Sequence, residues 1–328
     1  MMRIDAVITW VDGNDPKHRR KRTENGASVW ATSVDKAAET RFADVGEIFW
    51  CVASLNRYAS WLNKIYIVTD EQNPGLDDFL AVNFPKGHIP VEIVDHKAIF
   101  RGYEDCLPTF NSISIETMTW RIPGLSDCFI EFNDDFLLLD TTVPEDFFTE
   151  DGKPICYATV ASIVFDRFTR LFKAKKNGSR MVTTKGSHMN GAALAGHKFW
   201  YLRPAHFQKA LRRDFYEKFF NEHEEVMLKN ASFRFRDAEQ FSSEVLQYMS
   251  LNDSSACEVR SPKGALFFMQ PDGSESYFRK RMNRLSRFKG KFACFNSMDQ
   301  ASPEQLQAIV AWIEARLNVK FKKDYGRD

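Results

Sequence analysis

Short apolar and β-branched runs alternate with segments of helical spacing over the first 140 residues. Four runs are expected to be strands, each followed by a polar or acidic residue: 4–11, 64–69, 91–94 and 128–132. Apolar residues between 48 and 58, and again between 112 and 120, have helical spacing, whereas residues 16–41 are polar and are expected to form a long surface segment. Strands that alternate with helices predict an α/β fold with a mostly parallel sheet and flanking helices.

The pattern is different beyond residue 148. Residues 151–200 have no clear periodicity, and Lys173–Arg180 is expected to be an exposed basic loop. Segments 205–228 and 238–249 have the spacing of amphipathic helices. Ser302 is followed by a proline and, three residues on, by a glutamine, which predicts a capped helix running to about Leu317. We therefore expect residues 1–150 to form the α/β part and 151–328 a largely helical remainder of one integrated domain.

Acidic and amide side chains follow the predicted strands. These residues are Asp12, Asp70, Asp95 and the group Asn133-Asp134-Asp135. Ligands bind beyond the carboxyl ends of strands in open parallel sheets, so we expect a ligand site here. Adjacent carboxylates between apolar runs repel one another and resist burial unless a cation such as Mg²⁺ binds them. The alternative for Asn133–Asp135 is an ordinary acidic turn after a strand.

Composition narrows the class of protein. With 328 residues and 44% hydrophobic content, the chain can bury a large core as one large domain or a domain with an added lobe. Lysine and arginine number 45 against 44 acids, so the net charge of +1 does not indicate a nucleic-acid-binding protein. Six scattered cysteines without a Cys-x-x-Cys pair, and no apolar run long enough to span a bilayer, favour a cytoplasmic location.

Several polar residues in the remaining segments are candidates for chemistry. Arg234 and Arg236 lie before a predicted helix and can grip a phosphate or form surface ion pairs. His206 is expected to open a helix after Pro204, either as a general base or as a cap. Residues 107–112 can hold a sugar or phosphate or simply cap a helix. The basic run 279–291 is either a solvated face or a site for a polyanion or an anionic membrane.

Four blocks of this sequence resemble the Stealth family, which includes bacterial capsular polysaccharide phosphotransferases and the animal GlcNAc-1-phosphotransferase of lysosomal enzymes. The blocks, in the family's order, are residues 4–16, with Thr9-Trp10-Val11-Asp12-Gly13; 42–135; Arg203–His206 with Phe235–Glu239; and 291–297. The chain departs from the family at Ser297, where an aspartate is usual after Asn296, and at Gln208, where the family has a proline.

The resemblance implies a Rossmann-type, nucleotide-sugar transferase-like fold and a transferase that moves sugar-1-phosphate from a UDP-sugar donor, such as a UDP-N-acetylhexosamine, to a glycan acceptor. It implies Mg²⁺ (or Mn²⁺) held by Asp134 and Asp135, and catalytic roles for Asp135, His206 as base and Arg236. Substrate binding would involve Asp12, Gly13, Thr109, Asn111, Ser112, Asn133, Glu239 and Asn296. The alternatives are a metal-dependent glycosyltransferase that releases UDP and a glycan- or polyanion-binding protein with peripheral contact to the inner membrane.

Overall fold

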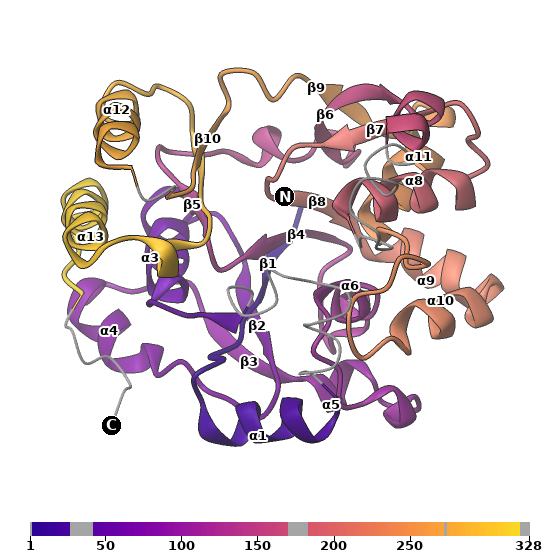
Figure 1. Ribbon diagram of the computed structural model, residues 1–328, viewed down its shortest axis with the longest axis horizontal. Coiled ribbons are helices and arrows are strands. Elements are labelled where there is room, and N and C mark those ends of the chain that lie inside the picture. The colour runs from indigo at the N-terminus through magenta and orange to yellow at the C-terminus, as the bar shows by residue number, and fades with distance from the viewer. Residues whose placement is uncertain (1, 27–41, 170–182, 272–273, 322–328) are drawn as a thin grey trace.

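A five-stranded sheet forms the centre of the molecule (Figure 1). A computed structural model describes residues 2–26, 42–169, 183–271 and 274–321. The strand order is β3-β2-β1-β4-β8, with β8 antiparallel at one edge and the other four strands parallel. The strands are β1 Ile4–Thr9, β2 Lys64–Thr69, β3 Val91–Asp95, β4 Cys128–Asn133 and β8 Lys209–Arg212. The predicted α/β fold with a mostly parallel sheet is therefore confirmed.

The four parallel strands arise where the sequence has its β-branched and aromatic runs. β2 has the predicted bounds, and β1 ends two residues early, where the Trp10 N–H still donates to the Val68 carbonyl at 3.0 Å. Alternate residues of β1 point to opposite faces. Ala6 and Ile8 pack into one apolar cluster, and Val7 packs into the other. Burial on both faces explains why β1, β2 and β4 are largely apolar, whereas the edge strand β3 leaves Glu92 and Ile93 exposed.

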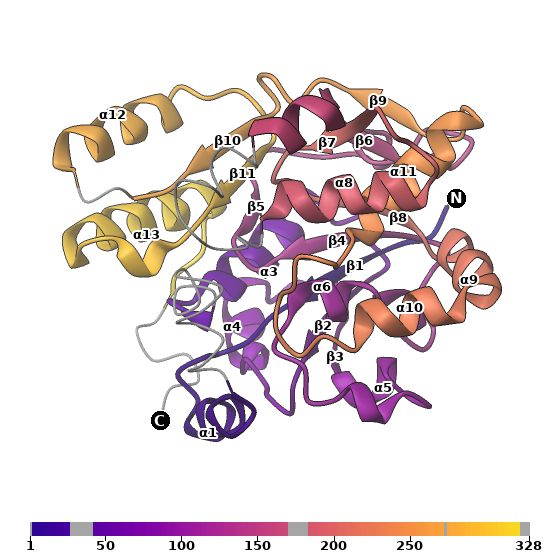
Figure 2. The ribbon, with the colours of Figure 1, turned by 45° about the vertical axis from the view of Figure 1, so that its right-hand side comes forward.

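Helices cover both faces of this sheet (Figures 1 and 2). One face packs against α3 Glu47–Tyr58, α4 Leu76–Asn83 and α13 Pro303–Leu317. The other face packs against α5 His96–Ile99, α8 Thr184–Leu194, α9 Arg213–Glu222, α10 Glu224–Ala231 and α11 Ser243–Asp253. Further helices among the described residues include α1 Pro16–Glu24, α6 Ser112–Glu116 and α12 Glu275–Leu285. The carboxyl ends of the parallel strands lie between these layers.

Two small sheets extend the core. The first has the order β10-β11-β5, formed by Leu266–Met269, Phe292–Phe295 and Phe136–Leu138. The second has the order β7-β6-β9, formed by Trp200–Pro204, Ile155–Ser162 and Glu258–Arg260. The chain leaves β4, turns at Asp134 and Asp135, and re-enters the core as β5, which pairs antiparallel with β11. This pairing brings residues 292–295 beside the acidic turn.

The helix predicted over residues 205–228 is wrong. Residues 205–208 form a loop, β8 follows, and only then do α9 and α10 begin. β8 pairs with β4 from Lys209 to Arg212, and the Gln247 side chain accepts a hydrogen bond from the Arg212 N–H at 2.7 Å. The open edge of β4 therefore overrides the helical spacing of Phe207, Leu211 and Phe215.

Other boundaries also differ from the predictions. Residues 151–200 contain β6 and α8, and residues 16–24 form α1, capped by the Asp15 side chain. Helix α11 starts five residues later than expected, at Ser243, because Ser242 caps it. Helix α6 ends at Glu116, and a short 3-10 turn Thr119–Arg121 follows it. The expected basic loop 173–180 and residues 27–41 lie outside the described residues.

The capped helix near the C-terminal end is confirmed. Ser302 accepts from the Gln305 N–H, and the Gln305 side chain accepts in return from the Ser302 N–H. In the described part of the chain, no helix combines the length and the apolar character needed to cross a bilayer.

Helix α8 approaches α11 closely at Gly191. A Cβ atom there would lie 2.6 Å from the Ser242 carbonyl oxygen, at the start of α11. We expect Gly191→Ala to lower the free energy of unfolding by about 2 kcal/mol, because overpacking against backbone outweighs the better helix propensity of alanine. Urea denaturation measures this, with Ala193→Ser on the exposed face of α8 as control. A variant as stable as wild type would show that the two helices separate freely.

Candidate active site

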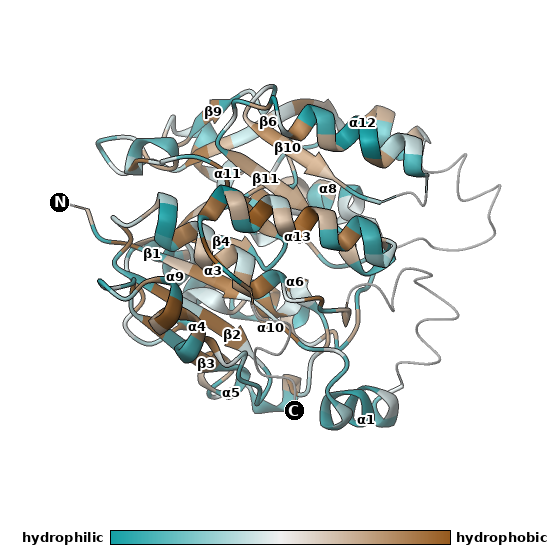
Figure 3. Ribbon diagram, turned by 90° about the vertical axis from the view of Figure 1, so that its left-hand side faces the viewer, coloured by the Kyte–Doolittle hydropathy of each residue, from teal (hydrophilic) through white to brown (hydrophobic). Residues whose placement is uncertain are grey.

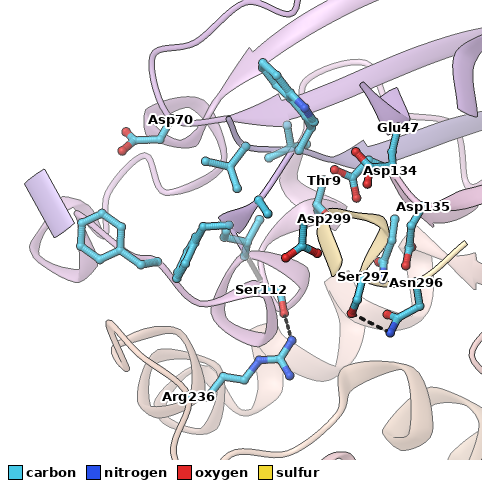
Figure 4. Close-up of a pocket in the computed structure, with 18 of the residues that line it drawn as sticks. Thr9, Glu47, Asp70, Ser112, Asp134, Asp135, Arg236, Asn296, Ser297 and Asp299 are labelled. Carbon is cyan, nitrogen blue, oxygen red and sulfur yellow. Dashed lines mark hydrogen bonds between the residues drawn. The ribbon is translucent and has the colours of Figure 1, made fainter. Parts of the chain in front are cut away.

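A cleft of about 460 Å³ opens at the carboxyl ends of β1, β2 and β4 (Figure 4). Its lining comes from distant parts of the chain: Thr9 and Trp10 after β1, Asp70 after β2, Asn133–Asp135 after β4, Thr109 and Ser112 around the start of α6, His206, Arg236 and the segment Asn296–Gln300. The predicted location of a ligand site at the strand ends is therefore matched by a cavity at that edge.

Carboxylates are concentrated on one side of the cleft. Burial, together with the charges of Asp135 and Asp44, raises the pKa of Asp134 well above its usual range. Glu47, the first residue of α3, is also buried, and burial and the charges of Asp134 and Asp44 raise its pKa well above the ordinary value. The Glu47 side chain accepts from the Val45 N–H at 2.7 Å, which fixes it beside the acidic turn. Such a group of repelling acids favours a bound cation.

Asp135 has a different environment. The Cys294 thiol donates to Asp135 Oδ2 at 3.4 Å, and His206 Nε2 lies 3.9 Å from the same oxygen. Burial raises the pKa of Asp135, whereas His206 and the Cys294 hydrogen bond lower it. Burial and the negative charge of Asp135 raise the pKa of the Cys294 thiol well above its usual value, so this residue stays protonated as a donor. The other carboxylate oxygen, Oδ1, is buried and has no hydrogen-bond partner.

These residues fit a divalent cation. Ligand atoms of Asp135, His206 and Cys294 lie within 4.8 Å of one another. The unpartnered Asp135 Oδ1 is an acceptor that lacks a donor, and the raised pKa values of Asp134 and Glu47 show that their ionised forms lack a compensating positive charge. Carboxylate oxygens suit Mg²⁺ or Mn²⁺, whereas a protonated thiol is a poor ligand for either. The oxygen atoms of the acidic turn are therefore the better candidate ligands.

His206 lies in the loop between β7 and β8, with 46% of its side chain exposed toward the cleft. The rings of Phe136 and Phe268 contact it edge-on, at centroid distances of 4.9 and 6.2 Å. Desolvation by these walls lowers the pKa of His206, and Lys209 lowers it further, although Asp135 opposes the shift. The imidazole is therefore neutral near pH 7 and can accept a proton.

Lys209 anchors the end of this loop. Its ammonium group lies 2.8 Å from Glu116 and 3.1 Å from Glu131, in a buried cluster under α11. Burial lowers the pKa of Lys209, but the two carboxylates outweigh burial and raise it. Burial raises the pKa of Glu131 to about 7, despite the opposing effect of Lys209. The cluster fixes the position at which the His206 loop enters the sheet.

Arg236 approaches the cleft from the segment before α11. Its guanidinium donates to the Ser112 hydroxyl at 2.8 Å, so the start of α6 and this segment meet at the cleft (Figure 4). Arginine in this position can donate to a phosphate in a planar, bidentate manner. Thr109, Asn133 and Asn296, which the sequence analysis named as candidate substrate-binding residues, also line the cleft.

Four of the predicted substrate-binding residues lie outside the cleft lining. The backbone of Asp12 is paired with the side chain of Gln72, and Gly13 packs against Phe42, whose carbonyl would be 2.0 Å from an added Cβ. Asn111 is buried, donating to the Phe233 carbonyl and to Gln240. Glu239 forms an exposed ion pair with Lys229 at 3.0 Å. These residues shape the walls and are not placed at the cavity itself.

Several residues in or directly behind the cleft lining gave no signal in the sequence. Glu47 resembles an ordinary acid in the first turn of a helix, and Cys294 resembles a core cysteine, so neither carried a signal. Ser297 lines the cleft where the family has an aspartate, and a carboxylate is present two residues later at Asp299, whose pKa is raised by burial. His18 and His96, both buried, line the opposite end, where burial lowers the pKa of each to about 4.

Asp134 should oppose folding when no cation is bound. Because its pKa is raised in the folded state, the ionised form costs stability, and this cost grows as pH rises above the ordinary value of 3.8. We expect Asp134→Asn to be more stable than wild type in EDTA at pH 8 by on the order of 1 kcal/mol, with a smaller gain at pH 5. Added Mg²⁺ should stabilise wild type and not the variant.

Urea denaturation at the two pH values measures these differences. Asp140→Asn, an exposed acid beyond β5, is the matched control and should change neither the stability nor its dependence on Mg²⁺. Equal stabilisation of wild type and Asp134→Asn by Mg²⁺ would contradict a cation at this turn.

Comparison with known proteins places the chain in a family. The family models described as Stealth protein CR1, conserved region 1, and Stealth protein CR2, conserved region 2, match residues 2–29 and 41–156. The capsular polysaccharide phosphotransferase WcwK of Streptococcus pneumoniae is 28% identical, over 95% of this chain and 96% of that protein. The exopolysaccharide phosphotransferase cps2G of Lactiplantibacillus plantarum is 28% identical, over 92% and 89%.

The solved structure of the galactosyltransferase LgtC, in complex with donor and acceptor sugar analogs, aligns over 97% of both chains with 11% identity and a TM-score of 0.43. The fold of this chain is therefore defined by its own strand order, described above. Both conserved regions match in chain order, and relatives of full length align from end to end. The chain belongs to the Stealth family.

Proposed function

We propose that this protein transfers a hexosamine-1-phosphate from a UDP-sugar to a hydroxyl group of a glycan, with release of UMP, in the synthesis of a bacterial capsule or other surface polysaccharide. Its relatives of full length are named capsular and exopolysaccharide phosphotransferases, which supports an enzyme that transfers a sugar phosphate. The observation that carries the proposal is the convergence of Asp134, Asp135, His206 and Arg236 on one cleft.

The reaction joins the acceptor oxygen to the β-phosphorus of the donor. The bond between this phosphorus and the oxygen that bridges to the α-phosphorus breaks, and that oxygen leaves with UMP. Negative charge moves toward the bridging oxygen, so catalysis requires positioning and charge neutralisation more than covalent participation. An acidic turn, an arginine and a neutral imidazole in one cleft supply these requirements.

His206 would take the proton of the acceptor hydroxyl. Its ring is neutral near pH 7 because the surrounding walls lower its pKa, and it is open to the cleft. Contacts with Phe136 and Phe268 hold the plane of the ring. Asp135, 3.9 Å from Nε2, would stabilise the imidazolium that forms when the proton arrives.

Arg236 would neutralise charge on the phosphate oxygens, with Ser112 holding its guanidinium in place. Thr109, Asn133 and Asn296 would orient the donor from the cleft walls. Four further residues would support the donor site without lining the cavity: Asp12, Gly13, Asn111 and Glu239.

A divalent cation, Mg²⁺ or Mn²⁺, would neutralise the pyrophosphate when bound. Asp134 and Asp135 would hold it, and Asp299 would supply a further carboxylate in place of the family aspartate that is missing at Ser297.

The nucleotide product separates this reaction from ordinary glycosyl transfer. Purified protein incubated with UDP-sugars and candidate glycan acceptors should release UMP, because the bond between the β-phosphorus and the bridging oxygen breaks. Chromatography of the nucleotides measures this, with EDTA as a control that should abolish release. UDP as the sole nucleotide product would show instead a metal-dependent glycosyltransferase.

Arg236 and His206 should have separable effects. We expect Arg236→Gln to lower kcat about 100-fold or more, since it removes charge stabilisation near the transferred phosphate. Arg234→Gln, which removes an exposed arginine bonded to Asn25, is the matched control and should remain near wild type.

For wild type, the acid limb of the kcat/KM profile should lie below pH 6.5, the usual pKa of histidine, because burial lowers the pKa of His206. An acid limb that persists in His206→Ala would assign the base elsewhere.

A further inference from the structure

A second groove, of about 560 Å³, lies beside the catalytic cleft and is strongly basic. Its polar lining consists of cations: Arg281 and Arg284 on α12, and Arg287 and Lys289 in the segment that follows it. None of the lining residues is acidic. The rest of the lining consists of apolar residues and glycines: Gly264, Leu266, Phe267, Phe268, Phe288 and Gly290. Figure 3 shows α12 as a largely hydrophilic helix on the surface of the molecule.

The cationic side chains of this groove lie together and have no acidic partners among the described residues. Arg281 and Arg284 are three residues apart on α12 and so share one side of this helix, and Arg287 lines the same groove just after the helix ends. Within the described residues, none of these arginines, nor Lys289, has an ion pair with an acid. The Arg281 guanidinium lies over the Phe267 ring, 4.4 Å from its centroid, and its Nε is buried without a hydrogen-bond partner. Uncompensated cations on an apolar wall favour an anion.

The floor of the groove is built for close approach. Gly264 and Gly290 both line it, and a Cβ at position 290 would lie 2.5 Å from the Gly264 carbonyl oxygen and 2.3 Å from the Phe288 ring. Side chains at this position would fill the space between β10 and the segment after α12. Gly290 therefore lets the segment after α12 approach Gly264 and the Phe288 ring more closely than any other residue would allow.

The groove adjoins the end of the cleft where the acceptor would bind. Phe268 lines the groove, and its ring also contacts the ring of His206, at 6.2 Å between centroids. Gln270, two residues further along the chain, lines the catalytic cleft. A chain bound in the groove would therefore extend past Phe268 toward the imidazole that receives the acceptor proton.

We propose that this groove binds phosphodiester groups of the acceptor glycan chain, which earlier rounds of transfer have made anionic. The inference rests on the proposed function, because joining sugars through phosphates gives a chain with one negative charge per linkage. Guanidinium groups bind phosphate oxygens through paired hydrogen bonds, and the phenylalanine rings offer apolar surface to the faces of the sugars. The groove thus selects an elongated, charged acceptor over a short neutral one.

Direct binding tests this without turnover. The probe is fluorescently labelled poly(glycerol phosphate), a chain of phosphodiesters, with neutral dextran as the reference. We expect Arg284→Gln combined with Arg287→Gln to weaken binding of the probe about tenfold, the size of two partly exposed charge contacts. Arg279→Gln with Lys280→Gln is the matched control, since it removes the same charge from α12 outside the groove and should leave the affinity near wild type.

Further arms make the outcome decisive. Arg284→Lys with Arg287→Lys keeps the charge and should retain part of the affinity, and thermal unfolding verifies that each variant is folded. Equal losses in the groove variant and the control pair would overturn the proposal, as would wild-type binding no tighter than to dextran. Binding to phosphatidylglycerol vesicles without binding to the polymer would assign the groove to a membrane surface instead. Because no donor is present, these results do not depend on whether UMP or UDP is released.

Discussion

Carboxylates that are buried together repel one another, and this fold gathers them at one edge of its sheet. The arrangement begins with the reversal after β4, where Asp134 and Asp135 turn the chain back into the core as β5. Ser54 on α3 accepts from the Leu138 N–H at 3.0 Å, so the helix that carries Glu47 also holds the strand that leaves the turn. Burial of the apolar core on either side stabilises the fold and so offsets the repulsion between these carboxylates.

The remaining groups reach the acidic turn by separate routes. β11 pairs with β5 and so places Cys294 against Asp135, and the loop before β8 brings His206 to the same carboxylate. Arg236 arrives from a segment that is tied to α6 through Ser112. Segments that are far apart in the sequence therefore depend on one another, and a change that moves β5 would disturb the contacts of both Cys294 and His206 with Asp135.

Much of the sheet could be predicted because β1, β2 and β4 are buried on both faces and are largely apolar. The edge strand β8 could not, because four residues from Lys209 to Arg212 pair only when β4 is already in place, and their spacing matches a helix equally well. In the cleft, Asp134 and Asp135 could be identified from the sequence because they are adjacent charges between apolar runs. Glu47 did not, because an acid at the start of a helix is common, and only the folded structure shows which charges face it.

The buried ion cluster around Lys209 limits the conformational entropy that the loop carrying His206 can lose. Lys209 is held by Glu116 and Glu131, and Pro204 on β7 pairs with Ala158, so the four residues that carry His206 are tethered at both ends. A tether this short leaves the loop few alternative conformations to lose when an acceptor arrives. In the proposed reaction the imidazole would thereby be preorganised, and the binding energy of the acceptor would remain available for bringing its hydroxyl into line with the phosphorus.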